Sequence, residues 1–132
     1  MLSSQFERVH YALATAAAAA AIDIPALLFF TQGAVRAVAG TAERPGWHSL
    51  GVDDSRIGGS DAAAADRAFR DRGAAGIEEL LAAGGELGVE FLVCSMGMRV
   101  AGIEKADLRP DLRLRETGLT DVLSRGGMPT FV

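Results

Sequence analysis

Two short and largely apolar segments constrain the fold of this 132-residue chain more than any other feature. They are residues 26–31, with the sequence ALLFFT, and residues 89–94, with the sequence VEFLVC. Runs of this length and character are typical of parallel strands, which are buried on both faces of a sheet. Since segments of helical periodicity lie before and after them, the sequence predicts an α/β fold with helices on both faces of a parallel sheet.

Helical periodicity predicts several helices around these strands. In the first, Phe6, Val9 and Leu13 recur at helical spacing and an alanine run of high helix propensity follows. The expected helices cover residues 5–22, 32–39, 61–71, 77–87 and 95–103, followed by a short one near the carboxyl end.

Two polar residues are expected to begin helices as N-caps, because their side chains can accept hydrogen bonds from free backbone N–H groups. Ser60 precedes the helix at residues 61–71, and Thr117 precedes the short helix near the carboxyl end. The apolar residues of that last helix are expected to face the core: Leu119, Val122 and Leu123.

The number of strands is the weak point of this pattern. A doubly wound domain has four or five strands, and only residues 26–31, 89–94 and 128–132 are good strand segments. Residues 1–3 and 112–115 are expected to add two short strands. We therefore predict one three-layer domain over residues 1–132, with a largely parallel sheet of about five strands. Its first strand is shortened at the amino terminus.

The charge pattern argues against nucleic acid and membrane partners. The formal charge is −4, and Arg109, Arg113 and Arg115 alternate with carboxylates, which predicts a solvated mixed face. The apolar segment at residues 12–30 is interrupted by Asp23 and Pro25, so we do not expect it to enter a membrane.

Cys94 is the only cysteine, which excludes an internal disulfide and a CxxC metal or redox pair. His10 and His48 are far apart in the sequence and no HExxH pattern is present, so a metal site is not expected. Neither GxxxxGK(S/T) nor GxGxxG occurs, and we predict no nucleotide or other cofactor. A lone thiol fits a reducing compartment, so the expected location is cytoplasmic.

The position of Cys94 in the chain is more informative than the fact that it is the only cysteine. It ends a predicted strand and begins a predicted helix, at the edge of an α/β sheet where ligands bind. A helix N-terminus there would favour the thiolate. Two interpretations remain open: an exposed, reactive thiol, or a buried side chain that acts as a small apolar residue. Peroxidase chemistry is disfavoured, because Phe91 stands three residues earlier where peroxiredoxin sites carry threonine.

Six residues are candidates to act with Cys94. His10 could orient or deprotonate the thiol, and Arg99 could hold a thiolate or an anion; a surface role is the alternative for each. Thr31 ends the first strand at the same edge of the sheet, and could bind a ligand or cap the next helix. The remaining candidates for ligand binding directly follow the cysteine: Ser95, Met96 and Gly97.

The long segment at residues 40–59 has no clear period, and a connection of this length is usually functional or mobile. It contains Trp47 and His48, which could form a lid. The alternative is that Trp47 anchors the segment to the body of the protein.

The chain resembles the DsrE/DsrF-like family of small sulfur-relay proteins along nearly its full length. The residues that carry the resemblance are 6–13 (FERVHYAL), 28–31 (LFFT), 79–81 (ELL), Cys94 and 101–103 (AGI). The resemblance implies a three-layer fold with a five-stranded, largely parallel sheet, in which Cys94 is the sulfur-accepting residue. It also implies homo-oligomers, often trimers or hexamers, with the cysteine near a subunit boundary. Some relatives carry the label "peroxiredoxin family", which Phe91 does not support.

The leading hypothesis is therefore a cytoplasmic sulfur-handling protein. Cys94 would accept sulfane sulfur as a persulfide and pass it to a partner protein. The alternative is a non-enzymatic, oligomeric ligand-binding or assembly module in which Cys94 is structural. A third hypothesis, a small-molecule enzyme with residues 40–59 as a lid, has less support.

Overall fold

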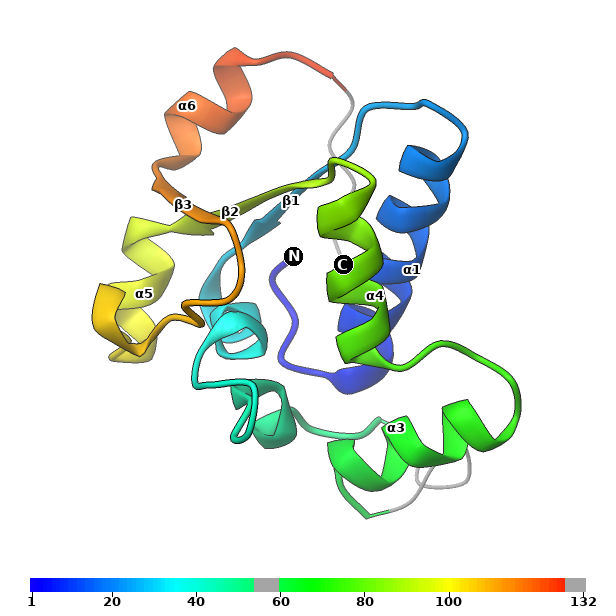
Figure 1. The fold of residues 1–132 in the computed structure, drawn as a ribbon. Helices are drawn as coiled ribbons and strands as arrows, with labels where there is room; N and C mark the ends of the chain where they lie inside the picture. The colour runs from blue at the N-terminus through cyan, green and yellow to red at the C-terminus, as the bar shows by residue number, and fades with distance from the viewer. Residues whose placement is uncertain (54–59, 128–132) are drawn as a thin grey trace.

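The computed structural model describes residues 1–53 and 60–127. Its helices and strands are arranged around one small sheet (Figure 1). The α-helices are α1 (Phe6–Ala21), α3 (Ala62–Asp71), α4 (Ile77–Glu86), α5 (Ser95–Ala101) and α6 (Leu119–Ser124). The 3₁₀ helices are η1 (Gln32–Val38), η2 (Gly46–Ser49) and η3 (Lys105–Asp107). The strands are β1 (Leu27–Phe30), β2 (Glu90–Cys94) and β3 (Leu114–Thr117).

The described residues form a three-stranded parallel sheet in the order β1-β2-β3. In its register Phe30 lies beside Val93, and Cys94 lies beside Thr117. This confirms the α/β class and the strands expected at residues 26–31 and 89–94, and places a third strand close to residues 112–115. Five strands and a third layer are not confirmed by the described ranges. The strand expected at residues 128–132 lies outside them.

The amino terminus lies beside β1 without forming a strand. The Met1 amino group donates a hydrogen bond to the Phe29 carbonyl at 2.7 Å, and the Met1 carbonyl accepts one from the Thr31 N–H at 3.0 Å. The Met1 side chain is buried, and burial lowers the pKa of its amino group. The expected first strand is thus reduced to one residue that bonds to β1.

One face of the sheet carries the hydrophobic core. Phe91 and Val93 of β2 point to this face together with Phe30 of β1, because alternate residues of a strand share a face. α1 and α4 lie side by side and contribute Leu13 and Leu81 to the same cluster (Figure 1). Burial of each such side chain stabilises the fold by about 1.5–3 kcal/mol.

The opposite face carries Leu92 and Cys94, which are buried but lie outside that cluster. Glu90 of β2 shares this face, and it pairs with Arg115 of β3 and with Arg125 at the end of α6. The first pair joins two neighbouring strands, and the second ties the end of α6 to the sheet.

α6 has no buried residue and stands apart from the body of the protein (Figure 1). Leu119 and Leu123 are 50% and 59% exposed, so the expectation that they face the core is wrong. The apolar spacing was compatible with a core-facing helix, but ion pairs from Arg115 to Asp121 and from Arg125 to Glu90 connect α6 to the sheet.

The N-caps differ from those expected by one residue. Asp61, not Ser60, caps α3, and its carboxylate accepts a hydrogen bond from the Ala64 N–H at 2.8 Å. Gly118, not Thr117, is the N-cap of α6, and the Thr117 hydroxyl donates to Asp121 instead. Within the described ranges, no helix combines the length and apolar character needed to cross a membrane.

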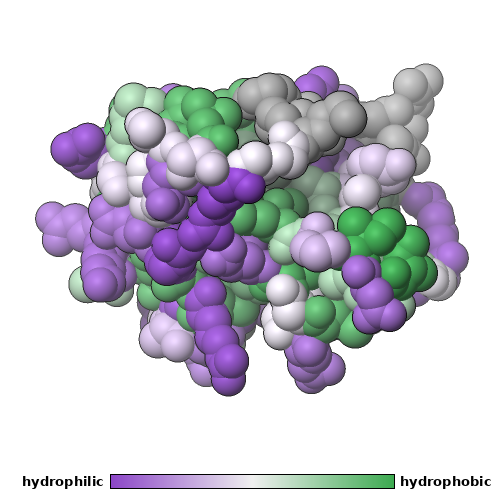
Figure 2. Space-filling view, turned by 90° about the horizontal axis from the view of Figure 1, so that it is seen from above, coloured by the Kyte–Doolittle hydropathy of each residue, from purple (hydrophilic) through white to green (hydrophobic). Residues whose placement is uncertain are grey.

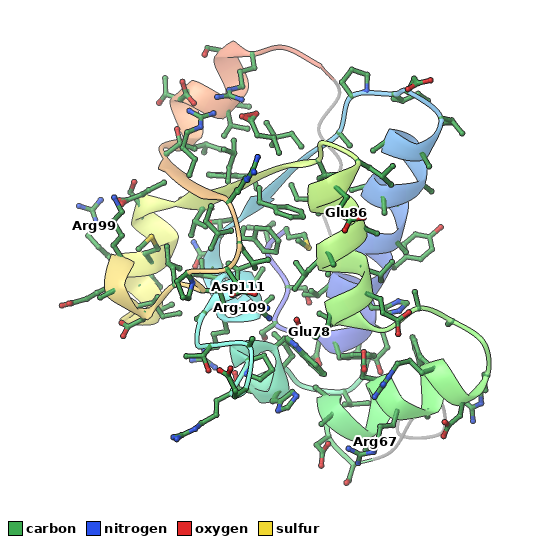
Figure 3. All side chains as sticks on the ribbon, viewed as in Figure 1. Arg67, Glu78, Glu86, Arg99, Arg109 and Asp111 are labelled. Carbon is green, nitrogen blue, oxygen red and sulfur yellow. The ribbon has the colours of Figure 1, made fainter. Side chains whose placement is uncertain are left out.

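Arg109 is buried at the centre of an ion network, so the expectation of a solvated arginine at this position is wrong. Its guanidinium donates to Asp111 and, at 2.5 Å, to Oε1 of Glu78, the oxygen that also accepts the Trp47 indole N–H at 2.7 Å (Figure 3). Hydrogen bonds to Asp111 and Glu78 raise the pKa of Arg109 further above its usual value, and Arg109 in turn lowers the pKa of Asp111. The network joins η2, α4 and the segment before β3. Trp47 thereby anchors the long segment after η1 to the body of the protein.

α5 approaches the end of β1 closely, and Gly97 permits this approach. A Cβ atom at Gly97 would lie 2.7 Å from the backbone nitrogen of Gln32 and 2.8 Å from Oγ1 of Thr31. Gln32 itself has a φ of 51°, a left-handed conformation that is uncommon for residues other than glycine. The α5–η1 contact therefore depends on an unusual backbone and on a missing side chain.

We predict that Gly97→Ala destabilises the protein by about 1–3 kcal/mol, because the new methyl group would meet the backbone of η1. The matched control is Gly85→Ala in α4, where the nearest atom to the new Cβ is 4.0 Å away. That control should stabilise by about 0.5–1 kcal/mol through helix propensity. Urea unfolding of both variants measures the difference, and equal effects would contradict this account of α5 packing.

Arg109→Met should destabilise the protein by about 2–3 kcal/mol, since it removes a buried cation that holds Asp111 and Glu78. This loss of stability is smaller than the loss expected for a fully buried ion pair, because the carboxylates of Glu78 and Asp111 are both half exposed. Arg113→Met is the control, since Arg113 is exposed and should change stability by less than about 0.5 kcal/mol. Thermal unfolding followed by Trp47 fluorescence tests both, and an Arg109 variant as stable as the control would refute the role of the network.

Candidate functional site

The carboxyl ends of all three strands meet at one edge of the sheet, and Cys94 lies at its centre. Cys94 ends β2 between Thr31, which follows β1, and Thr117, which ends β3. This edge is formed because parallel strands place their carboxyl ends together, and it is where ligands bind in open α/β sheets. The strand-to-helix placement expected for Cys94 is therefore present.

The Cys94 side chain is only 2% exposed, so the thiol is not open to solvent as the reactive interpretation expected. It lies on the sheet face opposite the main core cluster, next to the buried Leu92. Cys94 is also the N-cap residue of α5, but its side chain makes no capping hydrogen bond. This burial is a tertiary property that the local sequence does not reveal.

The three residues after Cys94 have different environments. The Ser95 hydroxyl donates to the Thr117 carbonyl at 3.3 Å, which links the start of α5 to the end of β3. Met96 is 49% exposed, whereas Gly97 is buried against η1. The segment thus covers the end of the sheet with one weak hydrogen bond on the β3 side and a tight contact on the η1 side.

Thr31 is buried at this edge and lies against Gly97. Its backbone forms the N-cap of η1, with its carbonyl accepting from the Ala34 N–H at 3.1 Å, but its side chain does not cap the helix. Thr31 therefore occupies the N-cap position, as the capping interpretation expected, but its hydroxyl does not act as the cap. Its hydroxyl makes no hydrogen bond to the described residues, and it lies directly after β1 against Gly97 in the turn that follows Cys94.

His10 is not part of this edge. One nitrogen of its ring lies at 2.7 Å, within hydrogen-bond distance, of the Ala75 carbonyl. The ring also packs edge-on against Phe69 with centroids 4.8 Å apart. The expected His10–Cys94 pair is thus not formed, because the contacts of His10 are with the segments around α3. Periodicity placed His10 on α1 but could not show which side of α1 it occupies.

Arg99 lies on α5 near the edge, but it is exposed and points away from the sheet (Figure 3). It forms no ion pair with any described residue, and its side chain does not contact the thiol edge in this conformation.

Two residues at the edge were not predicted as site residues from the sequence, Gln32 and Thr117. The backbone strain at Gln32 has no sequence signal, and Thr117 was seen only as a helix cap.

The site can therefore supply one thiol, the hydroxyls of Thr31 and Ser95, and backbone groups of two adjoining turns. Within the described ranges, no three His, Cys, Asp or Glu side chains are grouped closely enough to hold a metal ion. Such an arrangement can form and break a sulfur–sulfur bond at Cys94 once the thiol is uncovered, because that reaction requires only a thiolate and access for its partner.

Comparison with known proteins identifies the family of this chain. No curated protein matches the chain. The sequence profile of the DsrE/DsrF/DrsH-like family matches residues 32–124, which is more than two thirds of the 132 residues. The matched region includes β2 with Cys94, α5 and β3, while α1 and β1 precede it. The chain belongs to the DsrE/DsrF/DrsH-like family.

Proposed function

We propose that this protein handles sulfur, with Cys94 accepting a sulfane sulfur atom and passing it to a partner protein. The observation that carries the proposal is the position of Cys94, which ends the central strand within the matched part of the chain. Membership of the family points to sulfur relay in general. The single free cysteine also fits a reducing compartment, and we propose a cytoplasmic location on that ground.

The proposed reaction is two successive sulfur transfers. The Cys94 thiolate attacks the outer sulfur of a donor persulfide, a new S–S bond forms at Cys94, and the donor leaves as a thiolate. A thiolate of the acceptor then attacks the outer sulfur on Cys94 and takes it, which restores the Cys94 thiolate. Sulfur moves between thiolates without net oxidation, so the absence of a second cysteine in the chain is no obstacle.

The burial of Cys94 requires that its cover opens before transfer. We propose that Ser95, Met96 and Gly97 form this cover, and that the side near β3 opens. Its described side-chain link to β3 is the long Ser95–Thr117 hydrogen bond, whereas the η1 side is tightly packed. We propose that the Thr31 hydroxyl, which is buried at the same edge, then donates a hydrogen bond to the outer sulfur of the persulfide.

The partners proposed are a second copy of this chain and an acceptor protein. Two short helices next to the Cys94 edge expose apolar side chains: Met96 and Val100 on α5, and Leu119 and Leu123 on α6. Seen from the α6 side, the surface shows apolar side chains set among charged ones (Figure 2). Exposed apolar residues on a helix with no buried residue support a homo-oligomer in which a second copy covers α6. By family resemblance we propose a trimer or a hexamer.

The burial of Cys94 also favours a second candidate function. In this alternative the protein is an oligomeric ligand-binding or assembly module, and Cys94 is a packed side chain without chemistry. The two functions differ in whether Cys94 becomes accessible in the native protein.

Treatment of the native protein with a sulfane-sulfur donor should add about 32 Da, the mass of one sulfur, and Cys94→Ser should abolish the adduct. Intact-mass spectrometry measures both. Ser95→Ala should accelerate the reaction, because it removes the hydrogen bond that holds the cover to Thr117. Ser49→Ala, which removes an exposed hydroxyl far along the chain, is the matched control. A thiol that reacts only after unfolding would instead support the assembly-module function.

The double variant Leu119→Gln, Leu123→Gln should dissociate the oligomer into smaller species, because it makes the exposed side of α6 polar. Size-exclusion chromatography with light scattering measures the mass of each species. Tyr11→Gln, which changes an exposed aromatic residue on α1, should leave the mass unchanged. If the wild-type protein is a monomer at micromolar concentration, the homo-oligomer proposal fails.

A further inference from the structure

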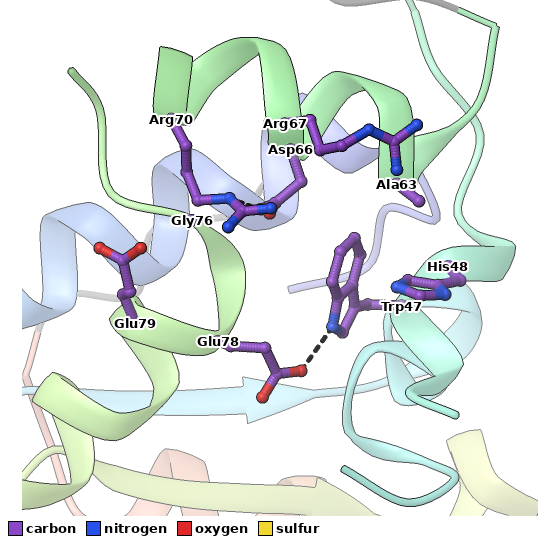
Figure 4. Close-up of a pocket in the computed structure, with 9 residues that line it drawn as sticks. All are labelled: Trp47, His48, Ala63, Asp66, Arg67, Arg70, Gly76, Glu78 and Glu79. Atoms are coloured by element: carbon purple, nitrogen blue, oxygen red, sulfur yellow. Dashed lines mark hydrogen bonds and ion pairs between the residues drawn. The ribbon is translucent and has the colours of Figure 1, made fainter. Parts of the chain in front are cut away.

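A groove away from the Cys94 edge separates η2, α3 and the start of α4 (Figure 4). Its volume is about 300 Å³, and one side of α3 forms a wall of it, with residues at helical spacing. Its lining residues from α3 are Ala63, Asp66, Arg67 and Arg70. Trp47 and His48 of η2 and the first residues of α4 form the other walls. This groove is independent of the proposed sulfur chemistry.

Two of the carboxylates in the groove are already bound within the protein. Asp66 accepts a hydrogen bond from the Ile77 N–H at 2.7 Å and pairs with Arg70 at 3.1 Å. Since Asp66 bonds to the first N–H of α4, the end of that helix is occupied. Glu78 receives the Trp47 indole N–H and the Arg109 guanidinium on one oxygen. These groups therefore build the walls and add little free negative charge.

Arg67 and His48 remain as donors without such bonds. Neither has a hydrogen bond or an ion pair with the described residues, although Arg67 belongs to the side of α3 that lines the groove. His48 is held edge-on to Trp47, with ring centroids 4.2 Å apart and an interplanar angle of 89°. Both side chains lie on the same side of Trp47, whereas Glu79, a further carboxylate of the lining, lies on the other (Figure 4).

We propose that this groove binds a small oxyanion, a carboxylate or a phosphate, between the guanidinium of Arg67 and the imidazole of His48. A planar guanidinium presents paired N–H donors to either anion, and a neutral imidazole can add one more. The buried Trp47 and the Asp66–Arg70 pair hold the walls in place, so the ordering cost of binding falls mainly on the exposed side chains of Arg67 and His48.

The chain has one tryptophan, so the fluorescence of Trp47 reports on this groove alone. Wild-type protein is titrated with sodium acetate and with sodium phosphate at an ionic strength held constant with sodium chloride. A saturable change with either anion supports the proposal and shows which oxyanion the groove prefers. A response that is absent or does not saturate for both anions overturns it.

Variants locate the binding site. Arg67→Gln should weaken binding of the responding anion about tenfold, and Arg67→Lys should recover part of the loss. Arg99→Gln is the matched control, since Arg99 is also exposed and unpaired among the described residues but lies on α5. Cys94→Ser should bind as the wild type does. Equal affinities for the Arg67→Gln protein and the Arg99→Gln control would overturn the proposed site, and the sulfur-transfer experiment is unaffected by either result.

Discussion

The pairing of β2 on both sides is the constraint on which the rest of the structure depends. Because β2 is hydrogen bonded to β1 and to β3, its side chains must divide between two faces. Phe91 and Val93 enter the core under α1 and α4, and Leu92 and Cys94 take the opposite face. A shift of one residue would place Cys94 in the core and Glu90 beside it. The position of the thiol is therefore fixed by strand register rather than by any residue that contacts it.

The parts of the fold that the sequence predicted well are those with a direct local signal. Segments 26–31 and 89–94 were recognisable as strands because a buried parallel strand is apolar throughout. The place of Cys94 at a strand end followed from the same signal. By contrast, Ser60 and Asp61 are both good caps, and no local rule decides between neighbours. Leu119 and Leu123 had core-like spacing, but only the tertiary structure shows that α6 is held by Glu90 and Arg115.

The site was predicted less completely because its geometry depends on segments distant in sequence. Gly97 fits against Thr31 and Gln32, more than sixty residues earlier, and the positive φ of Gln32 has no composition signal. The sequence placed His10 correctly on α1. It did not show that His10 lies on the side of α1 that contacts Phe69 and not on a side that faces Cys94. Arg109 lies among charged residues that suggested a solvated face, yet two carboxylates from different segments allow it to be buried.

The burial of Cys94 bears on specificity as well as on access. An exposed thiolate at this edge would react with any oxidant or small disulfide, and the product could pass to an irreversible state. A cover that must open locally makes the reaction rate proportional to the open fraction, which a docked partner can increase. The cover proposed for Cys94 is asymmetric, with close packing at Gly97 and a 3.3 Å hydrogen bond from Ser95 to Thr117 among the described residues. On this proposal the side next to β3 and α6 has the lower cost of opening, and α6 is a helix with no buried residue. A protein that docks on α6 would be in contact with the part of the structure that controls access to the thiol.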